Sequence, residues 1–191
     1  MSGYGYAGAN PLRLVDPSGK QAEAIFDIAK EAYRVAIAPA VLKANVDKAS
    51  GRVGAMAAGP LTTIKAGNTE ITFGLGPRSA YTDTDERVRR GQTVSQLVDG
   101  PLDAVRHAWA AAMTARDVGG VKTVALLTAY EDYEQFVLGH HQASCDMDRY
   151  NNLIGVSIGV ANADASDEHL FQLVMGALAN GKLLISPPRA R

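Results

Sequence analysis

The sequence predicts a mainly α fold: a helical bundle with a small β-hairpin at about residues 61–74 and an extended N-terminal segment. Three observations support this. Apolar residues recur at three- and four-residue spacing over several long stretches, which is typical of helices with one buried face. Two short β-rich runs flank Gly67-Asn68, a pair that favours a tight turn. The residues before position 21 hold alternate tyrosines, an Asn-Pro and a Pro-Ser-Gly, which are typical of strands and turns.

The first helix is predicted to start at Gln21 and to bend or end at Pro39, after about four turns. Its predicted buried face consists of Ala22, Ile25, Phe26, Ala29, Ala32, Tyr33 and Ala36. The hairpin follows, and Thr82 to Asp85 can cap a short charged helix that ends at Arg90.

Four further helices are predicted in the second half of the chain, over residues 101–117, 121–138 and 147–161 and from the Ser166 cap to Asn180-Gly181. Residues 139–146 are predicted to be a loop, and residues 182–186 a short strand or an extended tail. Residues 101–117 are apolar nearly all round, so we expect a central, buried helix.

Composition limits the possible functions. A formal net charge of −1 gives no general attraction to polyanions, and the run Arg87, Arg89 and Arg90 is more typical of a solvated helix face. We therefore predict no nucleic-acid binding. Cys145 is the only cysteine, so no internal disulfide forms. We find no signal peptide and no apolar run that could span a bilayer.

Polar residues interrupt the apolar faces of three predicted helices. His107 lies in a stripe of alanines, and Glu131 lies on the line of Val124 and Leu127. In the helix predicted over residues 147–161, Asp148, Asn151 and Asn152 form a polar stripe that continues into Gly155 and Gly159. A buried acid costs several kcal/mol unless it is paired, hydrogen-bonded, metal-bound or protonated. These side chains therefore predict one polar pocket between three helices.

Each residue also has a purely structural interpretation. His107 can be a hydrogen-bonded core histidine, Glu131 can form an ion pair with Arg106, and the asparagines can cap or turn the chain. His140 and His141 with Cys145 and Asp146 fit no strong zinc pattern. The hypothesis of a site depends on the fact that three predicted helices each carry polar residues on a face where apolar residues are expected.

The opening residues YGYAGANPLRLVDPSGK, from Tyr4 to Lys20, closely resemble the end of the core region of Rhs/YD-repeat proteins, which reads Tyr-x-Tyr, Asn-Pro and Asp-Pro-x-Gly. In that family a large β-shell encloses a variable C-terminal toxin that follows this element. Lys20 stands where many members have leucine at the autocleavage point. The resemblance implies that residues 1–20 are a remnant of the shell and residues 21–191 a single toxin domain.

The same resemblance implies an antibacterial effector used in interbacterial competition. Such effectors are secreted by a type VI secretion system or a related contact-dependent route and delivered into a target bacterial cell, either its periplasm or its cytoplasm. The expected partners are the Rhs shell of the precursor and a cognate immunity protein.

Residues 21–191 also resemble a family of bacterial domains found behind such shells, with the pattern Arg-His, then Trp, then His-Glu, then Met-Asp-x-x-Asn-Asn-x-x-Gly. Here Trp109 comes one residue early, and Tyr130 replaces the histidine before Glu131. The matching positions are Arg106, His107, Trp109, Tyr130, Glu131, Met147, Asp148, Asn151, Asn152 and Gly155.

We predict that His107, Glu131, Asp148 and Asn152 are catalytic and that Arg106, Asn151, Trp109 and Tyr130 bind substrate. A glutamate that orients an imidazole is a general acid/base pair, and Asp148 with Asn152 can position a water or bind a divalent cation. This chemistry favours a hydrolase acting on a cell-wall glycopeptide, a lipid or a nucleotide-type metabolite. The alternatives are a toxin that inserts into and depolarises the membrane, and one that blocks its target without turnover.

Overall fold

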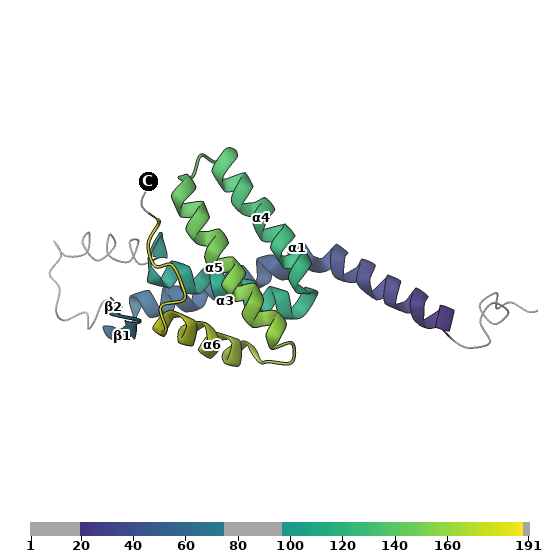
Figure 1. The fold of residues 1–191 in the computed structure, drawn as a ribbon, viewed down its shortest axis with the longest axis horizontal. Helices are drawn as coiled ribbons and strands as arrows, with labels where there is room; N and C mark the ends of the chain where they lie inside the picture. The colour runs from purple at the N-terminus through teal and green to yellow at the C-terminus, as the bar shows by residue number, and fades with distance from the viewer. Residues whose placement is uncertain (1–19, 75–96, 189–191) are drawn as a thin grey trace, which may run out of the picture. The chain divides into compact units, whose positions relative to one another are not determined.

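The computed structural model describes residues 20–74 and 97–188 and confirms a mainly α fold with a small hairpin (Figure 1). The described residues form helices α1 (Lys20–Ala58), α3 (Pro101–Val118), α4 (Gly120–Phe136), α5 (Gln142–Ala161) and α6 (Asp167–Ala179), and strands β1 (Thr62–Ala66) and β2 (Thr69–Phe73). The extended N-terminal segment and the charged helix predicted at 82–90 lie outside these residues. Of the described helices, none is both long and apolar enough to cross a membrane.

The chain divides by its contacts into two units, Met1–Ile37 and Ala38–Arg191. The boundary lies inside α1, next to Pro39. The prediction that Pro39 bends or ends the first helix does not account for its length, because α1 continues through Pro39 to Ala58. Proline removes one helical hydrogen bond. The turns after it are held by a buried face at Asn45, Ala49 and Val53, which packs in the core of the second unit.

The predicted buried face of the first helix is wrong for the side chains that the structure describes in the first unit. Ala29, Ala32, Tyr33 and Ala36 are exposed, with 65% of Tyr33 accessible. Helical periodicity reveals an apolar face but not whether the same chain supplies a partner for it. The first unit has no second element among its described residues that could cover these side chains.

The hairpin confirms the β prediction. Strands β1 and β2 pair antiparallel with Thr62 opposite Phe73 and Ala66 opposite Thr69, joined by a two-residue turn. Gly67 takes φ 59°, a left-handed conformation that glycine adopts without strain. Its amide donates to the carbonyl of Ala179 at 2.8 Å, which fixes the hairpin to the end of α6.

Helix α3 is the centre of the second unit and contacts α4, α5 and α6 (Figure 1). Most of its residues are buried, as its all-round apolar sequence predicts. Trp109 packs edge-on against Phe171 of α6, with ring centroids 5.0 Å apart. A single residue, Gly119 at φ 96°, joins α3 to α4 and turns the chain back along α3.

Two glycines allow α3 and α5 to pack unusually closely. A Cβ atom on Gly155 would lie 2.0 Å from the carbonyl oxygen of Ala108, and one on Gly159 would lie 2.1 Å from that of Ala112. No real Cβ tolerates such a contact with backbone. The glycines of α5 therefore lie on the alanine stripe of α3, and this contact brings the polar stripe of α5 beside His107.

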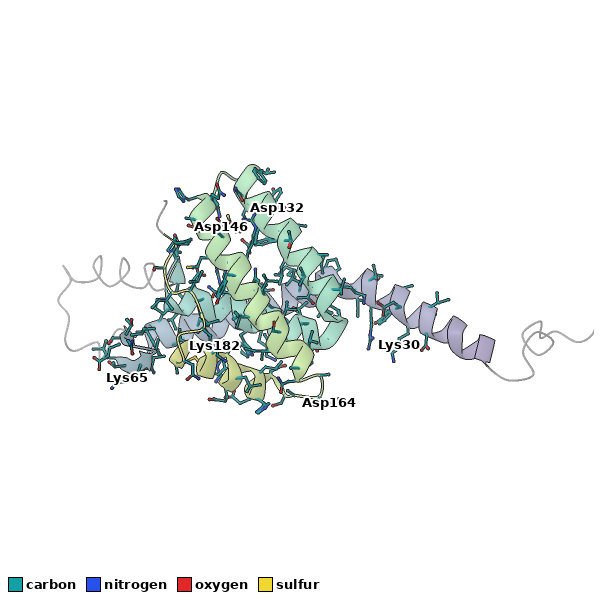
Figure 2. The ribbon with its side chains drawn as sticks, viewed as in Figure 1. Lys30, Lys65, Asp132, Asp146, Asp164 and Lys182 are labelled. Atoms are coloured by element: carbon teal, nitrogen blue, oxygen red, sulfur yellow. The ribbon has the colours of Figure 1, made fainter. Side chains whose placement is uncertain are left out.

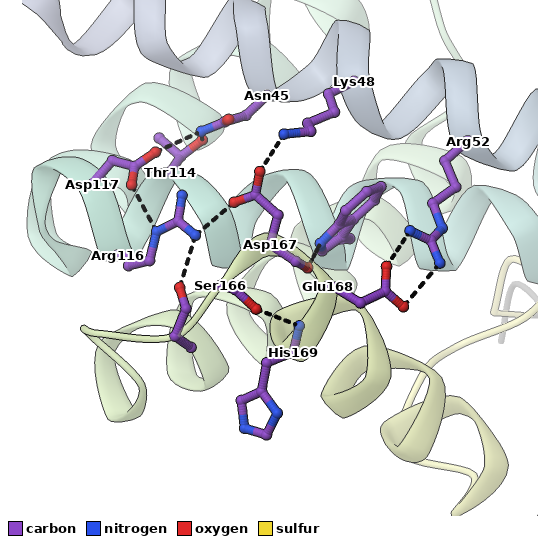
Figure 3. Close-up of polar contacts among 12 residues, drawn as sticks. Asn45, Lys48, Arg52, Thr114, Arg116, Asp117, Ser166, Asp167, Glu168 and His169 are labelled. Carbon is purple, nitrogen blue, oxygen red and sulfur yellow. Dashed lines mark hydrogen bonds and ion pairs between the residues drawn. The ribbon is translucent and has the colours of Figure 1, made fainter.

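Ion pairs and a cap hold the start of α6 against α1 and α3 (Figure 3). The Ser166 hydroxyl accepts from the His169 amide at 3.2 Å, which confirms the predicted cap. Asp167 forms ion pairs with Lys48 and, at 2.6 Å, with Arg116. Acidic groups in the first turn also suit the positive end of the helix dipole.

The start of α5 differs from the prediction, and the end of the chain decides between two predicted alternatives. Helix α5 begins at Gln142, so the predicted loop 139–146 is limited to residues 139–141; the reason is that Nδ1 of His141 accepts from the Ala143 amide at 3.2 Å and caps the helix earlier. Residues 182–186 form the extended tail rather than the strand.

Candidate active site in the second unit

His107 on α3 lies among three carboxylates from three helices. Its Nδ1 is 3.7 Å from Oε1 of Glu131 on α4. Its Nε2 is 3.4 Å from Oδ1 of Asp148 on α5 and 3.7 Å from Oδ1 of Asp103 on α3 itself. The structure thus brings the predicted groups His107, Glu131 and Asp148 to one place.

Asn152 links the two helices that face α3. Its Nδ2 donates to Oε1 of Glu131 at 3.1 Å, and both residues are buried. Asn152 lies one turn after Asp148 on α5, so the two side chains share one face. The four predicted catalytic residues therefore form one cluster, which we call the His107 cluster together with Asp103.

Asp103 is the member of the cluster that the sequence interpretation missed. It lies four residues before His107, on the same face of α3, and only 3% of it is exposed. Its Oδ2 accepts from the Asp99 amide at 2.8 Å, a local bond at the helix start that explains its position. An aspartate one turn before a histidine on an apolar helix is the signal that could have identified it.

The protonation of the cluster is strongly perturbed. Burial, followed by repulsion from Glu134, raises the pKa of Glu131 to about 7. Burial, followed by the charges of Asp103 and Glu131, raises the pKa of Asp148 to about 8. Burial and the Arg106 cation lower the pKa of His107 to about 3. His107 is therefore neutral near pH 7, whereas Glu131 and Asp148 exchange protons in that range.

Four buried oxygens of the cluster make no hydrogen bond: Oδ1 of Asp103, Oε2 of Glu131, Oδ1 of Asp148 and Oδ1 of Asn152. Unsatisfied buried acceptors are costly and rare in folded proteins. Oδ1 of Asp103 is in an ion pair with Arg106, and the other three atoms indicate a place that binds water, a cation or a substrate.

Arg106 supplies the nearest positive charge. Its Nη2 lies 2.5 Å from Oδ1 of Asp103, an ion pair whose angles do not meet those of a hydrogen bond, and 2.9 Å from Nε2 of His107. A guanidinium only donates, so Nε2 of a neutral imidazole accepts here and Nδ1 carries the proton toward Glu131. Arg106, a predicted substrate-binding residue, is thus part of the cluster.

A pocket of about 470 Å³ lies over the cluster, between α1, α3 and α4. Arg106, His107, Glu131 and Asn152 form its polar end, with Tyr130 and Glu134 nearby. A hydrogen bond to Glu134, together with burial, raises the pKa of Tyr130 to about 12. Tyr130 is half exposed and lines the pocket, a position compatible with its predicted contact to substrate. The remaining lining consists of the charged pair Lys43 and Asp47 and of six apolar residues: Pro39, Leu42, Val46, Ala110, Leu126 and Leu127.

The structure places two predicted substrate-binding residues elsewhere. Trp109 donates from Nε1 to the Asp167 carbonyl at 3.0 Å and packs against α6, so it belongs to the core. Asn151 is fully buried and forms two 2.9 Å hydrogen bonds with the backbone of Leu184. Neither lines the pocket. Spacing along a helix places a residue on a face but does not say which neighbour covers that face.

The residues around the α4–α5 turn form no site. Cys145 is buried, and burial raises the pKa of its thiol. Arg149 binds Asp132 at 2.7 Å and Asp146 at 3.0 Å, which ties α4 to α5. Figure 2 labels these two aspartates, Asp132 on α4 and Asp146 on α5. Among residues 20–74 and 97–188, the metal-ligand types gather closely enough for one ion only at Asp103, His107 and Asp148.

Comparison with known proteins places the chain in a family. No curated protein and no solved structure matches it. A family model described as a domain of unknown function (DUF6973) matches residues 78–182. This range is more than half of the 191 residues and includes every member of the His107 cluster. The chain therefore belongs to the DUF6973 family.

Proposed function

We propose that this protein is the C-terminal toxin domain of an Rhs protein and that it acts as a hydrolase at the His107 cluster. The observation that carries the enzymatic part is that His107, Glu131 and Asn152, from three helices, line one end of a pocket, and that Asp148 lies 3.4 Å from Nε2 of His107. Structural ion pairs are normally satisfied, whereas these residues keep unpartnered oxygens.

Glu131 is the base in this proposal. Its Oε1 is held by Asn152 and faces Nδ1 of His107, while Oε2 has no hydrogen-bond partner. Oε2 accepts a proton from water, the water oxygen forms the new bond to the substrate, and the same carboxyl returns the proton to the leaving group. Asp148 and Asn152 position the water through their unpartnered oxygens.

The residues that line the pocket indicate which class of substrate it can bind. Apolar side chains, mainly of α1 and α4, form most of the lining outside the polar end, together with Lys43 and Asp47. A substrate with an apolar part next to the bond to be broken would bury that part here. Among a glycopeptide, a lipid and a nucleotide-type metabolite, this favours a lipid.

The toxin part of the proposal is supported by the Rhs-like residues Tyr4 to Lys20. It includes secretion through a type VI or related system, delivery into a target bacterial cell, and neutralisation by a cognate immunity protein. The shell of the precursor would carry the domain to the point of export.

A growth assay tests the proposal. The full chain is expressed from an inducible promoter in a test bacterium, with and without a periplasmic export signal, as wild type, Glu131→Gln, His107→Ala and the control Asp132→Asn. We expect growth arrest by wild type and by Asp132→Asn in one compartment and none by the other two. If both site variants fold and arrest growth as wild type does, the hydrolase proposal is wrong.

Chemical analysis of the arrested cells then identifies the substrate. Thin-layer chromatography of extracted lipids is expected to show a product that is absent from cells expressing Glu131→Gln. Unchanged lipids with fragmented cell wall or depleted nucleotides would redirect the proposal to those substrates. Rapid depolarisation that persists in both site variants would favour the membrane-inserting alternative.

A further inference from the structure

The atoms around Nε2 of His107 have the composition of a metal site. One donor atom each from Asp103, His107 and Asp148 lies within 4.8 Å of the other two. The imidazole Nε2 stands 3.7 Å and 3.4 Å from the two aspartate oxygens. Ligands about 2.1 Å from a tetrahedral metal lie about 3.4 Å apart, so only small movements would complete the geometry.

The buried oxygens give a second, independent observation. Oδ1 of Asp103 and Oδ1 of Asp148 are two of the four acceptors without a hydrogen bond, and only 4% and 10% of these side chains are exposed. Two ionised carboxylates buried this close together are unfavourable unless cations compensate both, so the pair takes up either a cation or protons, and Arg106 contacts only Asp103.

Arg106 supplies the positive charge next to these donor atoms. Its Nη2 contacts Oδ1 of Asp103 and Nε2 of His107, two of the three donor atoms. A guanidinium carries one charge, whereas Asp103, Glu131 and Asp148 carry three when ionised. Its side chain is 34% exposed and lines the pocket, so it has room to move away from the donors.

We propose that Asp103, His107 and Asp148 bind one divalent first-row metal ion and that the guanidinium of Arg106 competes with the ion for the same donors. One imidazole with two carboxylates suits Mn²⁺ or Zn²⁺. Glu131 then orients the metal-binding imidazole through Nδ1, the arrangement in which a carboxylate supports a histidine ligand. The inference rests on the proposed function because both use this cluster, but metal binding is measurable without any substrate.

Calorimetric titration of the purified full chain with Mn²⁺ and with Zn²⁺ tests the inference, with metal content measured after dialysis. We expect one ion per chain and a raised melting temperature in its presence. Asp103→Asn is expected to abolish binding, and Arg106→Gln to tighten it by about tenfold because the competing charge is gone. Circular dichroism verifies that each variant is folded.

His140→Ala is the control for binding at the α4–α5 turn, where His140 Nδ1 lies 3.4 Å from Glu134. Its affinity is expected to equal that of wild type. Absence of binding in both wild type and Arg106→Gln would overturn the metal inference, as would binding that survives Asp103→Asn or disappears in His140→Ala. None of these results bears on whether Glu131→Gln removes toxicity, so the two proposals fail separately.

Discussion

Nδ1 of His107 and Oε1 of Glu131 face each other at 3.7 Å across the contact between α3 and α4, and Glu131 is fully buried. Asn152 of α5 holds the same glutamate oxygen at 3.1 Å. Such a contact does not arise from packing needs, because an apolar side chain would fill the space without a desolvation cost. We therefore expect the polar cluster to lower the stability of the fold.

Replacing the buried acid Glu131 by glutamine is expected to remove toxicity without lowering the free energy of unfolding. Glu131→Gln keeps the shape of the side chain and removes a buried carboxylate that has one unpartnered oxygen. We expect the variant to be as stable as wild type or about 1 kcal/mol more stable at pH 8, by urea denaturation, although it loses toxicity. A strongly destabilised variant would indicate that Glu131 is a structural ion-pair partner.

The close packing of α3 and α5 predicts a large effect of a single methyl group. Gly155→Ala would push Cβ into the backbone of Ala108, and we expect a loss of about 1–3 kcal/mol in the free energy of unfolding. Gly176→Ala on α6 is the matched control, since a Cβ there meets nothing within 4 Å. It is expected to gain up to about 1 kcal/mol. Equal effects of the two changes in denaturant titrations would contradict the packing described.

The ion pairs of Asp167 at the start of α6 predict how the free energy of unfolding depends on pH. Hydrogen bonds from Lys48 and Arg116 lower the pKa of Asp167 below its ordinary 3.8. The folded state therefore favours the ionised form, so its contribution is complete above that value and is lost as pH falls through the lower folded pKa.

The variant Asp167→Asn tests the direction of this pH dependence. We expect it to lower the melting temperature at pH 7, with a difference from wild type that shrinks toward zero as the pH falls below 3.8 and through the lower folded pKa. Thermal denaturation followed by circular dichroism measures both curves. A difference in melting temperature that stays constant over this pH range would show that the charge of Asp167 does not stabilise the contacts of α6 with α1 and α3.

Asn151 is expected to be structural rather than substrate-binding. Asn151→Ala removes both hydrogen bonds to Leu184 and leaves buried backbone groups without partners, at a cost of about 1–3 kcal/mol. Hydrogen exchange should show the Leu184 amide losing protection, while toxicity is retained at temperatures where the variant is folded. Loss of toxicity with an unchanged exchange pattern would restore the substrate-binding prediction.

Strong helical periodicity and end signals made the helices of the second unit predictable from sequence. Pro101, the Ser166 cap and Asn180-Gly181 marked their limits well. Pro39 did not, because the buried face at Asn45, Ala49 and Val53 outweighs one lost hydrogen bond. The start of α5 was misplaced because a histidine cap is less common than one of Ser, Thr, Asp or Asn.

The cluster itself was predictable where a polar residue interrupts an apolar stripe, as at His107 and Glu131. The surroundings of Asn151 and Trp109 could not be predicted, because periodicity gives a direction from the helix axis but no partner, and these two side chains bond to Leu184 and to the start of α6. Asp103 was missed because an aspartate in a first turn is explained by the helix dipole alone.

The toxicity of two isosteric variants on α5 tests the central claim most directly. Asp148→Asn changes a buried member of the cluster, whereas Asp146→Asn changes an exposed carboxylate on the same helix that binds only Arg149 among the contacts described. With both proteins folded and equally expressed, we expect Asp148→Asn to reduce killing of the test bacterium by about 100-fold or more and Asp146→Asn to kill as wild type does. Equal killing by the two variants would contradict an active site at the His107 cluster.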